Sequence, residues 1–98
     1  MEIIKTKDGA KLTLAVEGRL DTTTAPQLEE VVKTELEGIT ELKFDLAKLE
    51  YISSAGLRVL LAAQKIMNKQ GTMIINNAND EIMEGFEITG FADILTIE

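Results

Sequence analysis

Two adjacent serines, Ser53 and Ser54, stand directly before a helical pattern and are followed by Gly56. A serine in this position is typically an N-cap, whose oxygen accepts a backbone hydrogen bond worth about 1 kcal/mol. Gly56 needs another explanation, because glycine inside a helix costs about 1 kcal/mol relative to alanine. It indicates that some group approaches the backbone closely, or that the turn requires glycine.

The start of a helix also suits phosphate chemistry. The first backbone amides of a helix are unpaired donors with partial positive charge, so they accommodate an anion. Phosphorylation of a serine there adds a charge of about −1.5 to −2. The free domain would tolerate that charge, whereas an apolar or acidic partner covering the turn would not. The pair therefore predicts a binding site that phosphorylation controls.

Catalysis by the same serines would need a base, and the sequence offers none. The chain has no histidine and no cysteine, and it lacks both the Gly-x-Ser-x-Gly elbow and a Walker-type phosphate loop. Lys48 could act as a base only if burial removed its proton. Asp21 and Asp45 are candidates for metal binding or for ordering loops, and capping is the commoner role. We expect a protein that is not an enzyme and has neither cofactor nor metal.

Charge and hydropathy limit the partners. The 98 residues include 17 acidic and 10 basic side chains, a formal charge of −7, and residues 70–98 carry six acids and no base. Such a surface repels nucleic acid. The longest apolar run, residues 59–63, is far shorter than the ~20 residues of a membrane helix. The N-terminus shows no signal-peptide pattern. We expect a cytoplasmic protein that binds neither nucleic acid nor membrane.

Hydrophobic periodicity predicts one domain, residues 1–98, that positions the serines. A hairpin turns at Asp8-Gly9, and Thr24 and Gln27 have the spacing of a capping box at the start of an amphipathic helix that Gly38 ends. The later elements are expected in this order: a strand at 42–46, a loop at 48–53, a helix at 54–70, a strand at 72–76, a helix at 80–87 and a strand at 94–97. The order ββαβαβαβ favours an α/β fold with a mixed, mostly parallel sheet, because crossover connections produce parallel pairing.

Three segments together resemble the signatures of a known family. Phe44-Asp45-Leu46-Ala47, followed by Tyr51-Ile52-Ser53-Ser54-Ala55-Gly56-Leu57-Arg58, is similar to the main signature of STAS domains, especially the bacterial anti-sigma factor antagonists. Gly18-Arg19-Leu20-Asp21 resembles an earlier signature of that family. The expected element order and the length also suit a stand-alone STAS domain.

The resemblance implies a partner-switching protein. Its unmodified form would bind a serine-kinase anti-sigma factor and free the sigma factor, phosphorylation by that kinase would end the binding, and a serine phosphatase would restore it. Ser54 matches the phosphorylated serine when Gly56 sets the register. Ser53 is the alternative, and it stands where the best-studied members have aspartate. The resemblance also assigns partner binding to Asp21, Ser53, Ser54, Ala55, Gly56 and Arg58. A monomer is expected, and a STAS scaffold or accessory subunit without sigma-factor output is the alternative function.

Overall fold

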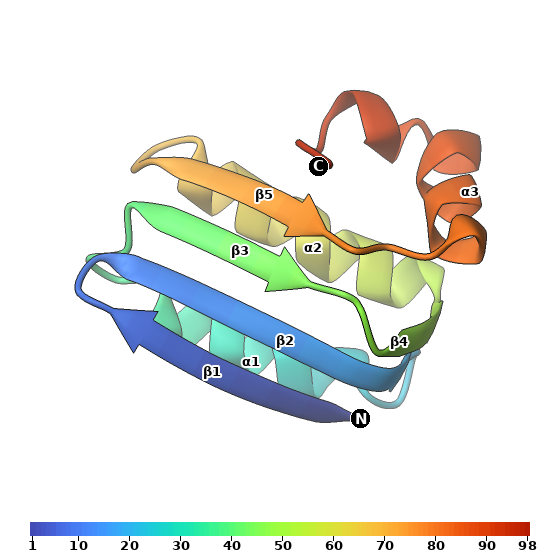
Figure 1. Cartoon of the computed structure of the whole chain (residues 1–98), viewed down its shortest axis with the longest axis horizontal. Helices are drawn as coiled ribbons and strands as arrows, with labels where there is room; N and C mark the ends of the chain where they lie inside the picture. The colour runs from blue at the N-terminus through green and yellow to red at the C-terminus, as the bar shows by residue number, and fades with distance from the viewer.

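An antiparallel hairpin opens the chain in the computed structural model, which describes all 98 residues (Figure 1). Strand β1 (Glu2–Asp8) pairs with β2 (Lys11–Leu20) in the register Asp8 to Lys11, so Gly9 and Ala10 form the turn. Gly9 has a φ of 62°, which suits a turn with a positive φ at its first central residue. The hairpin predicted at Asp8-Gly9 is confirmed.

Parallel pairing builds the rest of the sheet onto β2. The sheet has the order β1-β2-β3-β5, and β4 pairs with the far end of β2. All pairs except β1 with β2 are parallel. The remaining elements are α1 (Ala25–Glu35), β3 (Glu41–Asp45), β4 (Leu49–Ile52), α2 (Ser54–Met67), β5 (Thr72–Asn76) and α3 (Asp80–Thr89). The predicted α/β class with a mixed sheet is confirmed.

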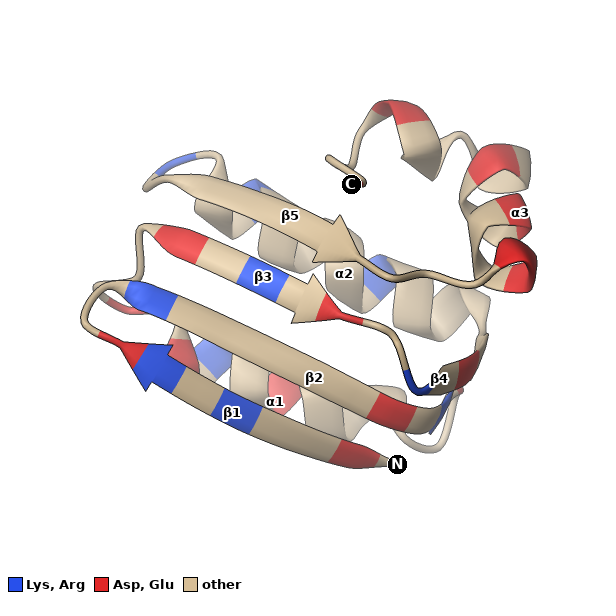
Figure 2. Ribbon diagram, viewed as in Figure 1, with Lys and Arg blue, Asp and Glu red and all other residues tan.

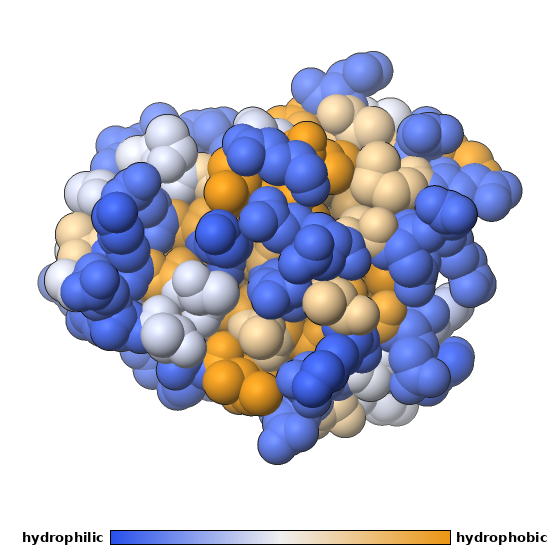
Figure 3. Space-filling view, in the orientation of Figure 1, coloured by the Kyte–Doolittle hydropathy of each residue, from blue (hydrophilic) through white to orange (hydrophobic).

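The core lies between the sheet and the helices on one of its faces. Helices α1 and α2 run along this face, while α3 lies beyond the end of β5 (Figure 1). Alternate residues of β2, namely Leu12, Leu14 and Val16, point into the core. The aromatic residues of the core are Phe44 and Phe86. The opposite face has no helix over it, and apolar and charged side chains mingle there (Figure 3). No helix has the length and apolar character that crossing a membrane requires.

Two elements differ from the order expected from the sequence. Residues 49–52, expected to be loop, form β4, because this short segment pairs with β2 after a register shift between Gly18 and Arg19. The strand expected at 94–97 is reduced to one bridge between Ile75 and Ile97, which follows a short 3-10 helix at Phe91–Asp93. The observed order is ββαββαβα.

The start of α1 also corrects a prediction. Thr24 precedes the helix, but its side chain makes no capping hydrogen bond, so the capping box with Gln27 is wrong. The Thr24 hydroxyl instead accepts from the backbone N–H of Asp21 at 2.8 Å and donates to the carbonyl of Arg19 at 2.9 Å. The loop between β2 and α1 therefore uses the hydroxyl that the helix was expected to use.

Candidate functional site

The junction between β4 and α2 lies where the parallel strands end. Because β2 and β4 run parallel, their carboxyl ends meet at one edge of the sheet, with Arg19 opposite Tyr51 and Leu20 opposite Ile52. The backbone N–H of Ser53 donates to the carbonyl of Leu20 at 2.8 Å. This bond joins the residue before Asp21 to the residue before Ser54. Ligand sites of open α/β sheets commonly lie at this edge.

The two serines have different structural roles. Ser53 is the N-cap of α2, and its half-buried Oγ accepts a hydrogen bond from the backbone N–H of Gly56 at 3.3 Å. Ser54 is the first residue of the helix, is exposed, and its hydroxyl forms no hydrogen bond within the chain. Aspartate and serine are about equally good N-caps. Ser53 therefore caps α2 without the negative charge that an aspartate at this position would add.

Gly56 is buried and allows the first turn of α2 to lie against the sheet. A Cβ atom there would be 2.7 Å from Cγ of Leu20 and 2.9 Å from Cγ1 of Ile52. These separations are far below van der Waals contact, so only glycine fits without a shift of its neighbours. The close approach predicted from Gly56 is confirmed, and the approaching groups are the chain's own side chains.

Asp21 orders the loop that borders this junction. Its Oδ1 accepts from the backbone N–H and the hydroxyl of Thr23, at 3.0 and 2.8 Å, and from the backbone N–H of Thr24 at 3.1 Å. The Thr23 hydroxyl, together with the two amides, holds the pKa of Asp21 below its ordinary value. The loop-ordering role predicted for Asp21 is confirmed.

A shallow hollow lies between the starts of α1 and α2. Its volume is about 240 Å³, and it includes the two remaining predicted site residues, Ala55 and Arg58, with Thr22, Ala25, Pro26, Glu29 and Val59. The sequence did not single out these α1 residues, because only the fold brings them beside α2. It also missed Arg19 and Tyr51, although both stand within the quoted signatures. The guanidinium carbon of Arg19 lies 4.4 Å from the centre of the Tyr51 ring, a distance typical of a cation–π contact.

Asp45 has a structural partner at the same edge. Its Oδ1 accepts from the backbone N–H of Ala47 and from Nδ2 of Asn77, both at 3.0 Å. The Asn77 amide, followed by the Ala47 amide, lowers the pKa of Asp45. Nowhere in the chain do three or more histidine, cysteine or acidic side chains gather as metal ligands would. The two hydrogen bonds of Asp45 connect the loops after β3 and β5.

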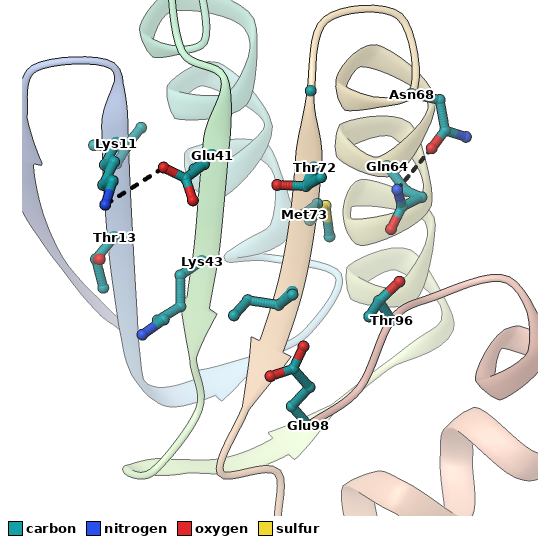
Figure 4. A pocket seen from close by; sticks show the side chains of 13 residues that line it. Lys11, Thr13, Glu41, Lys43, Gln64, Asn68, Thr72, Met73, Thr96 and Glu98 are labelled. Carbon is teal, nitrogen blue, oxygen red and sulfur yellow. Dashed lines mark hydrogen bonds and ion pairs between the residues drawn. The ribbon is translucent and has the colours of Figure 1, made fainter.

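The largest hollow, about 650 Å³, lies at the opposite edge of the sheet (Figure 4). Lys11, Glu41 and Thr72, the first residues of their strands, line it. Gln64 also lines it, is buried, and donates from Nε2 to Oδ1 of Asn68 at 2.9 Å. This hollow includes none of the predicted site residues.

Comparison with known families decides the assignment, since the STAS domain model matches residues 3–98. The chain belongs to the STAS domain family. The anti-sigma-B factor antagonist of Listeria monocytogenes is 34% identical over 98 residues, which covers 97% of this chain and 85% of that protein. The protein of the same name from Bacillus subtilis is 31% identical over 83 residues, with 84% and 76% covered.

Solved STAS structures share the fold. The unphosphorylated form of the anti-sigma factor antagonist SpoIIAA superposes with a TM-score of 0.79 at 15% identity, covering 99% of this chain and 87% of that one. An anti-sigma factor antagonist from Mycobacterium paratuberculosis gives a TM-score of 0.89 at 21% identity, with 98% and 83% covered. The STAS fold predicted from the three signature segments is thus confirmed.

Proposed function

We propose that the chain is a binding module that phosphorylation of Ser54 controls. Its unmodified form binds a serine-kinase anti-sigma factor and thereby frees the sigma factor. The observation that carries this proposal is the contrast between the serines: the Ser54 hydroxyl is exposed and unbonded, whereas Ser53 caps α2. A kinase can therefore reach the Ser54 hydroxyl without breaking a hydrogen bond of the fold.

The surroundings of Ser54 tolerate a phosphate in the free protein. The first turn of α2 contains no acidic residue, and the helix terminus stabilises an anion there by up to about 1 kcal/mol at an exposed site. Arg58 is four residues further along the same helix and is exposed, and residues with this spacing share a helix face. A phosphoryl group on Ser54 therefore has a cation within its own helix.

The same phosphate would weaken binding to a partner that covers Ser54. Covering Ser54 would remove the phosphate from water, and an uncompensated buried charge typically costs several kcal/mol. Reversing a population from 1:99 to 99:1 requires a difference of about 5.5 kcal/mol in binding. Because the helix terminus returns only about 1 kcal/mol, a buried phosphate on Ser54 is sufficient to end the complex. A serine phosphatase would restore the docking surface.

The residues around Ser54 suit a neutral docking surface. Ala55 is half-buried and Gly56 is buried, and neither residue has a polar side chain to present to a partner. Asp21, fixed by Thr23 and Thr24, presents a carboxylate at the border of this surface. We infer that the partner lies over the start of α2 and meets Asp21 with a basic group.

The test is a kinase assay with matched variants. The purified chain is incubated with the anti-sigma kinase of the source organism and ATP, and the added phosphoryl group is mapped by mass spectrometry. Wild type and Ser53→Ala should be modified at Ser54, whereas Ser54→Ala should not. In binding measurements, Ser54→Ala should bind constitutively and Ser54→Asp should bind more weakly. Modification at Ser53, or wild-type affinity of Ser54→Asp, would refute the proposal, and a complete lack of modification would favour the scaffold function.

A further inference from the structure

An apolar hollow between β4 and α3 lies at the same end of the molecule as Ser54. Its volume is about 350 Å³, and it is lined by Tyr51 and Ile52 of β4 and by Glu81, Ile82, Glu84, Gly85 and Ile88 of α3. The side chain of Ile88 is 77% exposed, compared with 52% for Ile94 and 45% for Ile4. Ile88 is thus the most exposed large hydrophobic side chain of the protein, and it lines a hollow that can receive an apolar group.

The α3 side of this hollow carries negative charge that no ion pair neutralises. Glu81 and Glu84 are exposed, and none of the four ion pairs of the chain involves a residue of α3. Every charged position of α3 in Figure 2 is acidic, because residues 70–98 contain no lysine or arginine. A partner with basic groups around an apolar centre would complement this surface.

The hollow is continuous with the proposed docking surface. Tyr51 and Ile52, which form its β4 wall, lead through Ser53 directly to Ser54. Ile52 also lies against the first turn of α2, since a Cβ on Gly56 would be 2.9 Å from its Cγ1. A partner large enough to cover Ser54 would therefore also reach the hollow.

We propose that the hollow is a second contact for the kinase that modifies Ser54, which places an apolar side chain against Ile88 and basic side chains opposite Glu81 and Glu84. This inference rests on the proposed function. Phosphorylation leaves these residues unchanged, so the second contact stabilises the complexes of both forms. It sets how readily the kinase captures its substrate, while Ser54 decides whether the unmodified or the modified complex persists.

The experiment compares two variants of the hollow with two matched controls. Glu81→Lys/Glu84→Lys reverses the charge of its α3 side, and Glu30→Lys/Glu37→Lys makes the same charge change at exposed residues of α1 and the loop after it, which form no ion pair. Ile88→Ser removes the apolar contact, and Ile94→Ser removes another exposed isoleucine. Affinity for the purified anti-sigma kinase of the source organism is measured at low and high salt, after urea unfolding has verified that each variant is folded.

The charge reversal on α3 should weaken binding on the order of tenfold at low salt and reduce its salt dependence, because exposed charges act through a screened field. Ile88→Ser should weaken binding about tenfold at both salt concentrations, and both controls should stay within about twofold of wild type. Variants of the hollow that bind like wild type, while Ser54→Asp still weakens binding, would overturn this inference alone. A wild-type dimer that Ile88→Ser converts to monomer would also overturn it. A kinase that does not bind or modify the wild type would refute the proposed function itself.

Discussion

Replacement of Gly56 by alanine tests how the first turn of α2 is held. The new Cβ would be 2.7 Å from Cγ and 3.0 Å from Cδ2 of Leu20, and 2.9 Å from Cγ1 of Ile52. Leu20 is fully buried and has no room to move aside. Overpacking of this kind costs about 1–3 kcal/mol, whereas alanine gains about 1 kcal/mol in helix propensity. Because the new Cβ would meet three atoms at 3.0 Å or less, we expect a cost in the upper part of this range, about 2–3 kcal/mol, and a net loss of about 1–2 kcal/mol of unfolding free energy.

Urea unfolding followed by circular dichroism measures this loss directly. The matched control is Gly85→Ala in the interior of α3, where a Cβ would meet no atom within 4 Å. The control should be stabilised by up to about 1 kcal/mol, since only the propensity difference remains. The two substitutions therefore have opposite expected signs. A Gly56→Ala protein as stable as wild type would refute the idea that close packing requires glycine here.

Three further predictions concern the two serines at the start of α2, the loop that Asp21 orders, and the contact of Gln70 with the segment after α1. Ser53→Ala should lose about 1 kcal/mol of unfolding free energy because the N-cap is removed, whereas Ser54→Ala should not change stability measurably; equal losses in urea would contradict the assigned roles. The pKa of Asp21 in the folded protein lies below its ordinary 3.8, so the unfolded chain binds more protons near that pH. The ionised Asp21 therefore stabilises the fold fully above about pH 4, and this stabilisation is lost as the pH falls through the folded pKa. Asp21→Asn should therefore show a weaker decline of the urea midpoint on acidification, and an unchanged decline would remove Asp21 as its source. Gln70→Ala should lose about 1–3 kcal/mol, because Nε2 donates to the carbonyls of Leu36 and Ile39 at 2.6 and 2.7 Å; a thermal melt identical to wild type would contradict this.

Local patterns were sufficient to predict the elements that have strong periodicity. The alternation of Leu12, Leu14 and Val16 predicted β2 because one face of that strand packs on the core. The four residues of β4 could not be recognised in the same way, since their strand character depends on pairing with β2 beyond an irregular register. Tertiary pairing of this kind leaves no periodic signal in a segment so short.

The candidate site was partly predictable for a similar reason. Gly56 indicated a close approach because its conformational cost needs a compensating contact, and the contact with Leu20 and Ile52 confirms this. The sequence could not distinguish a capping serine from a free one, since both Ser53 and Ser54 stand before the helical pattern. Only the backbone shows that Ser53 has the extended conformation of an N-cap. Arg19 and Tyr51 were missed because their contact depends on the pairing of β2 with β4.

The division of roles between the two serines would let the proposed switch operate without a change of fold. A phosphate on Ser53 would turn the oxygen that accepts from the Gly56 N–H into an ester oxygen, and it would place a dianion at a half-buried position. A phosphate on Ser54 leaves that hydrogen bond intact, and the helix terminus stabilises the added charge by up to about 1 kcal/mol. The free protein therefore changes little, while a partner that covers Ser54 must desolvate a dianion at a cost of several kcal/mol. Because nearly all of the difference appears in the complex, the modification is expected to act on affinity and not on stability.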